Sequence, residues 1–144
     1  MTESSHRAER EDGLRTLLVA EDSATVQAFY EASIGAADGY RLLIAWDGEQ
    51  ALEMAQSERP DAVLLDVRMP RMDGYEVCER LKADECTRDI PVLFASVLAE
   101  SDRVRRAYQS GADGYLTKPF TRHELLAALE GLFVELEPPA EQAS

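Results

Sequence analysis

Short apolar runs alternate with longer amphipathic segments along this chain, a pattern typical of folds built from βαβ units. Each run has the length of a strand. The third is unbroken, as expected of a central parallel strand covered on both faces. The predicted strands span residues 17–20, 41–45, 62–65, 92–95 and 114–117.

Between these runs, apolar residues recur at the spacing of helical turns. Val26, Phe29 and Tyr30 share one face of the first predicted helix, and four leucines and a phenylalanine form the buried stripe of the last. Glycine and proline mark several helix ends. The predicted helices span residues 23–34, 48–59, 75–83, 100–110 and 121–136.

Five strands in alternation with five helices predict an α/β fold with a doubly wound five-stranded parallel sheet, because right-handed crossovers place helices on both sheet faces. Residues 14–136 carry the pattern and are predicted to form one domain. The terminal segments, residues 1–13 and 137–144, lack any periodicity and are expected to be flexible tails.

Composition narrows the function classes. The chain has 144 residues, 28 acidic and 15 basic side chains, and a formal net charge of -13. Such a balance argues against nucleic-acid binding, which needs a basic patch. No apolar run is long enough to span a membrane, and the polar N-terminal segment predicts no secretory signal. Cys78 and Cys86 are expected to be reduced thiols, so the predicted location is the cytoplasm.

Charged residues stand at the carboxyl ends of three predicted strands. Glu21 and Asp22 follow the first strand, Asp66 follows the third, and Lys118 follows the fifth. The carboxyl ends of parallel strands meet at one edge of the sheet, so these side chains are expected to converge. An aspartate at the end of a buried strand costs free energy to ionise unless a cation or donor faces it. The sequence therefore predicts a cation site beside a carboxylate nucleophile.

Magnesium suits this set of residues. It prefers oxygen ligands and keeps several waters, so two carboxylates and one carbonyl are enough protein ligands. Asp22 and Asp66 are predicted as direct ligands, the backbone carbonyl of Arg68 as a third, and Glu21 as a ligand through water. A carboxylate can also act as a nucleophile and form an acyl phosphate.

Ordinary structural explanations exist for several of these residues. Glu21 and Asp22 also fit a helix cap, Ser96 at the end of the fourth strand also fits a turn hydrogen bond, and Tyr115 also fits a half-buried strand aromatic. The joint occurrence of acids and lysine at matching strand ends favours a site.

Taken together, residues 14–136 resemble the receiver domain of two-component response regulators. The resemblance implies a flavodoxin-like (βα)5 fold with strand order 2-1-3-4-5. The motifs that carry it are the acidic pair Glu21-Asp22, Asp66 with the following MPRMDG loop, Ser96, Tyr115 and Lys118-Pro119.

Further expectations come from this resemblance. It implies that Asp66 accepts a phosphoryl group from a histidine kinase or a histidine phosphotransfer protein, and that the domain is a signalling module, not an enzyme. Ser96 and Lys118 would engage the phosphoryl group. Tyr115 would reorient as a switch of the face made by the fourth helix, fifth strand and fifth helix, where the downstream partner is unknown. A cis peptide bond is expected before Pro119.

Three features set this chain apart from the family's common pattern. Val97 stands where receivers usually carry Ala or Gly. Arg68 and Leu98 occupy positions that tune phosphoryl lifetime in the family. Ala128 and Glu130 stand where dimerising regulators usually have arginines, so a monomer or weak dimer is expected.

Other functions remain open at this stage. A haloacid-dehalogenase-type phosphatase also uses an aspartate nucleophile with magnesium, but after its first strand, where this chain has Glu21. A flavin-binding flavodoxin-like protein needs a Ser/Thr/Gly phosphate loop where this chain is acidic. A receiver that only scaffolds would lack a site residue, and none is missing. A phosphorelay or phosphate-sink receiver from a hybrid kinase or larger regulator is the remaining alternative.

Overall fold

The computed structural model describes residues 13–134. The predicted tails, apart from Gly13, and the predicted end of the last helix lie outside this range. Within it, strands and helices alternate as predicted. The strands are β1 (Arg15–Ala20), β2 (Tyr40–Ala45), β3 (Ala62–Leu65), β4 (Val92–Ser96) and β5 (Gly114–Thr117), and the helices are α2 (Ala24–Ser33), α3 (Gly48–Glu58), α4 (Gly74–Ala83), α5 (Ser101–Gln109) and α6 (Arg122–Val134), with a short 3-10 turn η1 (Ala36–Asp38).

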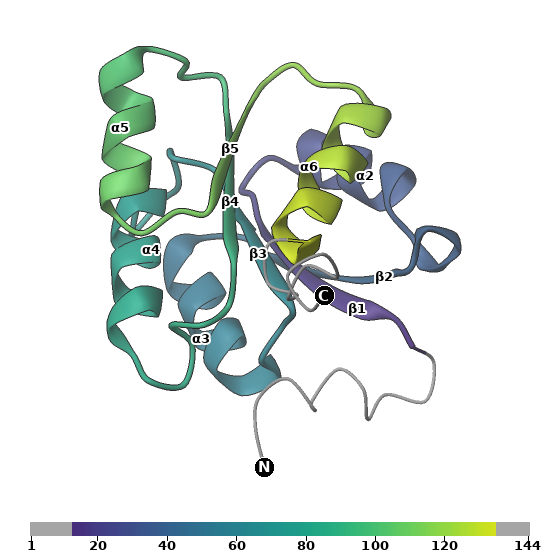
Figure 1. Ribbon diagram of the computed structural model, residues 1–144, viewed down its shortest axis with the longest axis horizontal. Helices are drawn as coiled ribbons and strands as arrows, with labels where there is room; N and C mark the ends of the chain where they lie inside the picture. Colours follow the sequence, from purple (N-terminus) through teal and green to yellow (C-terminus); the bar gives the residue numbers. More distant parts are fainter. Residues whose placement is uncertain (1–12, 135–144) are drawn as a thin grey trace, which may run out of the picture.

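All neighbouring strands pair in parallel, and their order is β2-β1-β3-β4-β5. This confirms the predicted order 2-1-3-4-5. Helices α2 and α6 cover one face of the sheet, and α3, α4 and α5 cover the other (Figure 1). The strand order reverses between β1 and β3, which places the ends of these two strands at the usual ligand crevice of such sheets.

The sheet separates two apolar cores. Leu18 and Ala20 of β1 face the core under α3, α4 and α5, while Leu17 and Val19 face the core under α2 and α6. Successive side chains of a strand point to opposite faces, so a strand buried on both sides must be apolar throughout. All four residues of β3 are buried, as the unbroken run predicted.

Side-chain caps set several helix starts. Ser23 accepts a hydrogen bond from the Val26 amide (3.3 Å) and Asp47 from the Gln50 amide (2.8 Å). Both residues lie just outside the helices that they cap, which moves the first helix start from residue 23 to 24. Phe29 and Tyr30 contact each other on one face of α2 as predicted, with ring centroids 5.6 Å apart, although the Phe29 side chain is 37% exposed.

Gly74 lets α4 begin directly against the end of β3. A Cβ at Gly74 would lie 2.2 Å from the carbonyl oxygen of Asp66 and 3.0 Å from the Phe94 ring. No side chain fits at such distances, so only glycine allows this close approach. The loop after Asp66 is therefore tied tightly to the helix that follows it.

We expect Gly74→Ala to destabilise the protein by about 1–3 kcal/mol or more, because the new methyl group overlaps the backbone of Asp66. Gly131→Ala is the matched control, since Gly131 is an exposed helical glycine with nothing within 4 Å of a Cβ. It should stabilise the protein by roughly 0.5–1 kcal/mol. Urea unfolding of both variants checks this, and equal stabilities would contradict it.

Candidate functional site

Three predicted site residues meet at the carboxyl edge of the sheet. The Lys118 ammonium donates to Asp66 Oδ2 (2.7 Å) and to Glu21 Oε1 (3.1 Å). These residues follow β5, β3 and β1, which are not adjacent in the chain. The register of the parallel strands therefore brings together what the sequence separates by up to 97 positions.

The three charged side chains are largely shielded from solvent, which strengthens the attraction between them. The side chains of Lys118, Asp66 and Glu21 are 15%, 17% and 4% exposed. Burial alone lowers the pKa of Lys118, but its hydrogen bond to Asp66 and the charges of Asp66 and Glu21 outweigh burial. The pKa of Lys118 therefore lies above its ordinary value, and the ammonium stays charged at neutral pH.

Backbone amides hold the two carboxylates in place. Asp66 Oδ1 accepts from the Arg68 amide (3.1 Å), and Glu21 Oε2 accepts from the Ser23 amide (3.1 Å). Each carboxylate thus has one oxygen on the backbone and one on Lys118. Asp66 keeps partial access to solvent, while Glu21 is buried.

Asp22 is placed differently from its neighbour. It is exposed and lines a cavity of about 530 Å³ beside the loop that follows Asp66. Among residues 13–134, no group of three or more His, Cys, Asp or Glu side chains lies close enough to hold a metal ion. Lys118 pairs with Glu21 and Asp66, and the metal-ligand role of Asp22 stays a prediction. The oxygen donors themselves suit magnesium, which needs few protein ligands.

Ser96 and Tyr115 converge on the same residue. Ser96 is buried and its hydroxyl accepts from the Leu98 amide (3.2 Å). Tyr115 is partly buried, its hydroxyl donates to the Leu98 carbonyl, and burial raises the pKa of that hydroxyl. In this conformation Ser96 makes a turn hydrogen bond, which is the structural role that the sequence analysis gave it beside the proposed contact with a phosphoryl group.

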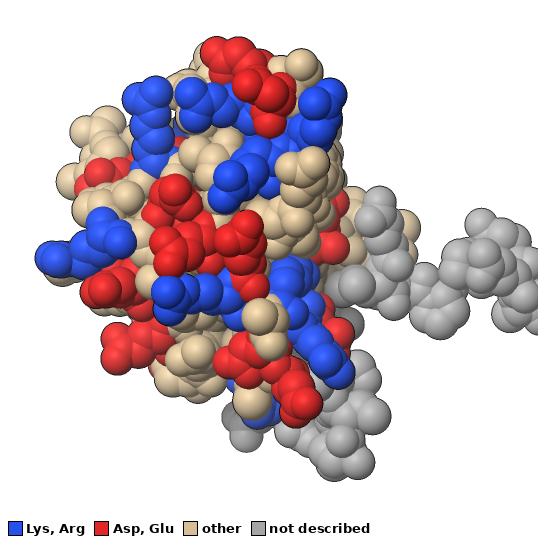
Figure 2. Space-filling view, turned by 90° about the vertical axis from the view of Figure 1, so that its left-hand side faces the viewer, with Lys and Arg blue, Asp and Glu red and all other residues tan. Residues whose placement is uncertain are grey.

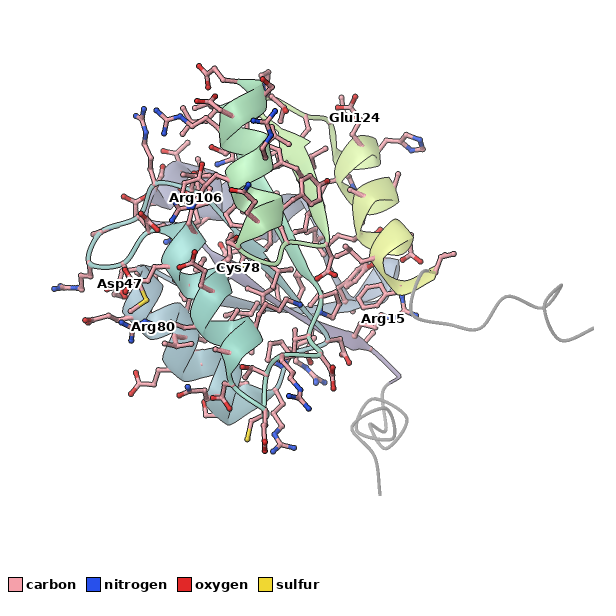
Figure 3. All side chains as sticks on the ribbon, turned by 60° about the vertical axis from the view of Figure 1, so that its left-hand side comes forward. Arg15, Asp47, Cys78, Arg80, Arg106 and Glu124 are labelled. Atoms are coloured by element: carbon pink, nitrogen blue, oxygen red, sulfur yellow. The ribbon has the colours of Figure 1, made fainter. Side chains whose placement is uncertain are left out.

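Sequence reasoning missed an aromatic row behind Tyr115. Phe94 stacks on Tyr115 with ring centroids 6.1 Å apart, and Tyr75 lies 5.8 Å from Phe94. The Tyr75 hydroxyl donates to the Arg103 carbonyl (3.3 Å), and the Arg106 guanidinium lies 4.8 Å from the Tyr75 ring centroid. Figure 3 shows Arg106 on the side of α5 that faces α4. The row joins the helix after the Asp66 loop to β4, β5 and α5.

The remaining family positions fall as follows. The peptide bond between Lys118 and Pro119 is cis, as expected. Val97 is exposed, whereas Leu98 is buried. Glu130 accepts from the Tyr40 hydroxyl (2.8 Å), so its side chain is engaged within the domain.

None of the helices in the described part of the chain is both long and apolar enough to cross a membrane.

Comparison with protein families gives one description. Residues 17–130 match the family model of the response regulator receiver domain. The chain is 41% identical over 123 residues to the response regulator MprA of Mycobacterium avium, covering 85% of this chain and 52% of that protein. It is 37% identical over 116 residues to the DNA-binding dual master transcriptional regulator RpaA of Synechocystis, covering 81% and 48%. The chain spans about half the length of these curated relatives.

Solved structures agree with this description. The receiver domain of sensor histidine kinase PA1611 from Pseudomonas aeruginosa, with a magnesium ion in its active site cleft, matches with a TM-score of 0.77 and 33% identity over 84% of this chain and 98% of that one. A response regulator of Chloroflexus aurantiacus matches with a TM-score of 0.79 and 30% identity over 84% and 98%.

The ion pair of Lys118 predicts a dependence of stability on alkaline pH. A raised lysine pKa contributes stability that is fully present below the unfolded value of about 10.4 and is lost as pH rises through the folded value. We therefore expect the free energy of unfolding of the wild type to fall above this pH by more than that of Lys118→Met.

Urea unfolding of both proteins in neutral and strongly alkaline buffer measures this difference. Lys82→Met is the control, because it removes another lysine that pairs with a carboxylate, Asp113, and should keep the alkaline fall. Equal falls in the wild type and in Lys118→Met would contradict the prediction.

Proposed function

The chain belongs to the response regulator receiver domain family, and from this premise we propose that a histidine kinase or a histidine phosphotransfer protein phosphorylates it on Asp66. The observation that carries the proposal is the contact of Lys118 with Asp66 (2.7 Å) beside the buried Glu21. A partly exposed carboxylate held beside a fixed ammonium is suited to accept an anionic group.

The transfer needs little covalent chemistry from the protein. A carboxylate oxygen of Asp66 attacks phosphorus and forms the new P–O bond. The P–N bond of the donor phosphohistidine breaks, and its electron pair stays on the imidazole. Lys118 would neutralise charge on the phosphoryl oxygens, and Ser96 would donate a hydrogen bond to one of them once its hydroxyl turns.

Magnesium is the proposed cofactor. Asp22, Asp66 and the backbone carbonyl of Arg68 would hold it, with Glu21 acting through water. When bound, it supplies positive charge opposite the phosphoryl oxygens. Support comes from the oxygen donors on this edge of the sheet and from the magnesium ion in the cleft of the PA1611 receiver domain. Among described residues, Asp22 is the carboxylate that Lys118 leaves free for this role.

Phosphorylation is proposed to act through the face made by α5, β5 and α6. Ser96 and Tyr115 both bond to Leu98, so drawing Ser96 toward a phosphoryl group changes the surroundings of the Tyr115 hydroxyl. The effect is a population shift between two packings, limited by the differential binding of the phosphoryl group. Arg103 and Tyr108 are exposed on α5 and belong to the surface that such a shift would change.

The domain itself is proposed to be a signalling module that contacts proteins in the cytoplasm, without turnover of a separate substrate. Its net charge of -13 does not suit direct contact with nucleic acid. The second candidate is a phosphorelay or phosphate-sink receiver, favoured by the likeness to a receiver domain of a sensor kinase. The two differ in whether phosphorylation changes the α5–β5–α6 face.

Incubation with acetyl phosphate and magnesium is expected to add one phosphoryl group to the protein, labile to hydroxylamine because it is an acyl phosphate. Asp66→Asn should abolish the addition, and chelation of magnesium should prevent it. Asp22→Asn should slow it. Asp89→Asn is the control, since Asp89 is an exposed loop aspartate remote from the site in sequence, and it should label normally. Intact-protein mass spectrometry gives the result, and equal labelling of Asp66→Asn would refute the assignment.

Beryllofluoride with magnesium mimics the phosphoryl group and tests the switch. Amide shifts are expected to change near Asp66 and Lys118 and then along residues 97–122. Tyr115→Ala should reduce the changes on α5, and Tyr108→Phe on the surface of the same helix should not. Changes confined to the acceptor edge would support the relay candidate and contradict the switch.

A further inference from the structure

Two arginines beside the loop after Asp66 have no side-chain partner among residues 13–134. Acidic and basic side chains interleave over the face that carries α3, α4 and α5 (Figure 2), and most cations there are paired. Within residues 13–134, the side chains of Arg68 and Arg103 make neither an ion pair nor a hydrogen bond. Arg88 and Arg105 are also unpaired among these residues, but Arg68 and Arg103 differ from them in lining a cavity beside the loop after Asp66.

Both arginines line the same cavity. It measures about 530 Å³ and lies between the loop after Asp66 and α5, with Asp22 and Asp73 also on its wall. The Asp73 carboxylate already accepts from the Glu76 amide (2.9 Å), where it caps α4. The cavity therefore lies beside the loop that follows Asp66 and has two guanidinium-bearing residues on its wall.

The backbone of each arginine is anchored. The Arg68 amide donates to Asp66 Oδ1 (3.1 Å), which ties Arg68 to the acceptor itself. The Arg103 carbonyl accepts from the hydroxyl of Tyr75, whose ring is buried between Phe94 and Arg106. The backbone of each arginine is therefore held in place, one in the loop after Asp66 and the other in α5. Guanidinium groups match the planar oxygens of a carboxylate and bind them through paired hydrogen bonds.

We propose that Arg68 and Arg103 form an anion site that takes a carboxylate of the phosphoryl-donor protein, next to its phosphohistidine. This inference rests on the proposed function of Asp66. A phosphorylated donor is negatively charged, and the net charge of -13 repels it. Lys118 is occupied by Asp66 and Glu21, so the two arginines are the cations left on this cavity to orient the donor. The site selects donors with an acidic residue beside the histidine.

The binding step is tested with glutarate, a small dicarboxylate, followed through the arginine Nε–H signals by NMR. Saturable shifts are expected for Arg68 and Arg103, and Arg103→Gln should weaken the binding. Arg105 is the matched control, because it is exposed on the same helix and does not line the cavity. Absence of a saturable shift at both Arg68 and Arg103 would overturn the anion site.

The donor step is tested with peptides phosphorylated chemically on one histidine and flanked either by Glu or by Gln. The wild type should accept the phosphoryl group about tenfold faster from the Glu peptide, the factor that corresponds to one charged hydrogen bond. Arg103→Gln should bring the ratio of the two rates close to one, and Arg105→Gln should keep it. The ratio is taken within each variant, so a general change in the reactivity of Asp66 cancels.

Other outcomes separate this inference from the proposed function. A wild-type rate ratio of one together with glutarate binding would overturn the donor assignment and leave a site for free anions. An unchanged ratio in Arg103→Gln would overturn the role of Arg103. Failure of acetyl phosphate and of both peptides to label Asp66 would instead refute the proposed function, while glutarate binding would still report on the anion site.

Discussion

Negative charge at the carboxyl edge of the sheet is the constraint on which this domain depends. Parallel strands bring Glu21 and Asp66 to one place, where burial and mutual repulsion would both raise the free energy of the folded state. The ammonium group of Lys118 offsets both costs, because it contacts the two carboxylates at 3.1 and 2.7 Å. The same arrangement leaves Asp66 partly exposed and next to a cation. The contact that stabilises the fold therefore also prepares the proposed acceptor.

Close packing links this edge to the rest of the molecule. Gly74 brings α4 against the carbonyl of Asp66, and the next residue, Tyr75, begins the aromatic row that reaches Tyr115 through Phe94. Aromatic rings packed in contact transmit a shift more readily than solvated side chains, because cores are dense and have few alternative packings. The row is a second set of contacts through which a change at the acceptor loop can reach α5. The first set runs through Ser96 and Leu98.

Charge is distributed so that a strongly acidic chain presents cations where the proposed chemistry needs them. Lys118 is held in its ion pairs, and Arg106 is held over Tyr75. Arg68 and Arg103 have no ion-pair partner in the part of the chain that the structure describes, and they line a cavity beside the acceptor loop. A net charge of -13 disfavours the approach of another anion, so cations beside the acceptor loop gain weight in orienting a partner.

The sequence by itself determined the five strands, the helices between them and the meeting of Asp66, Glu21 and Lys118, because apolar periodicity and residues at strand ends are local signals. Family likeness added the strand order and the cis bond before Pro119. Only the tertiary structure decided that Asp22 stays exposed, that Tyr75 joins Phe94 and Tyr115, and that Arg68 and Arg103 share one cavity. These contacts join side chains that belong to different strands, helices and loops. They depend on how the helices pack on the sheet, and no local sequence pattern encodes that packing.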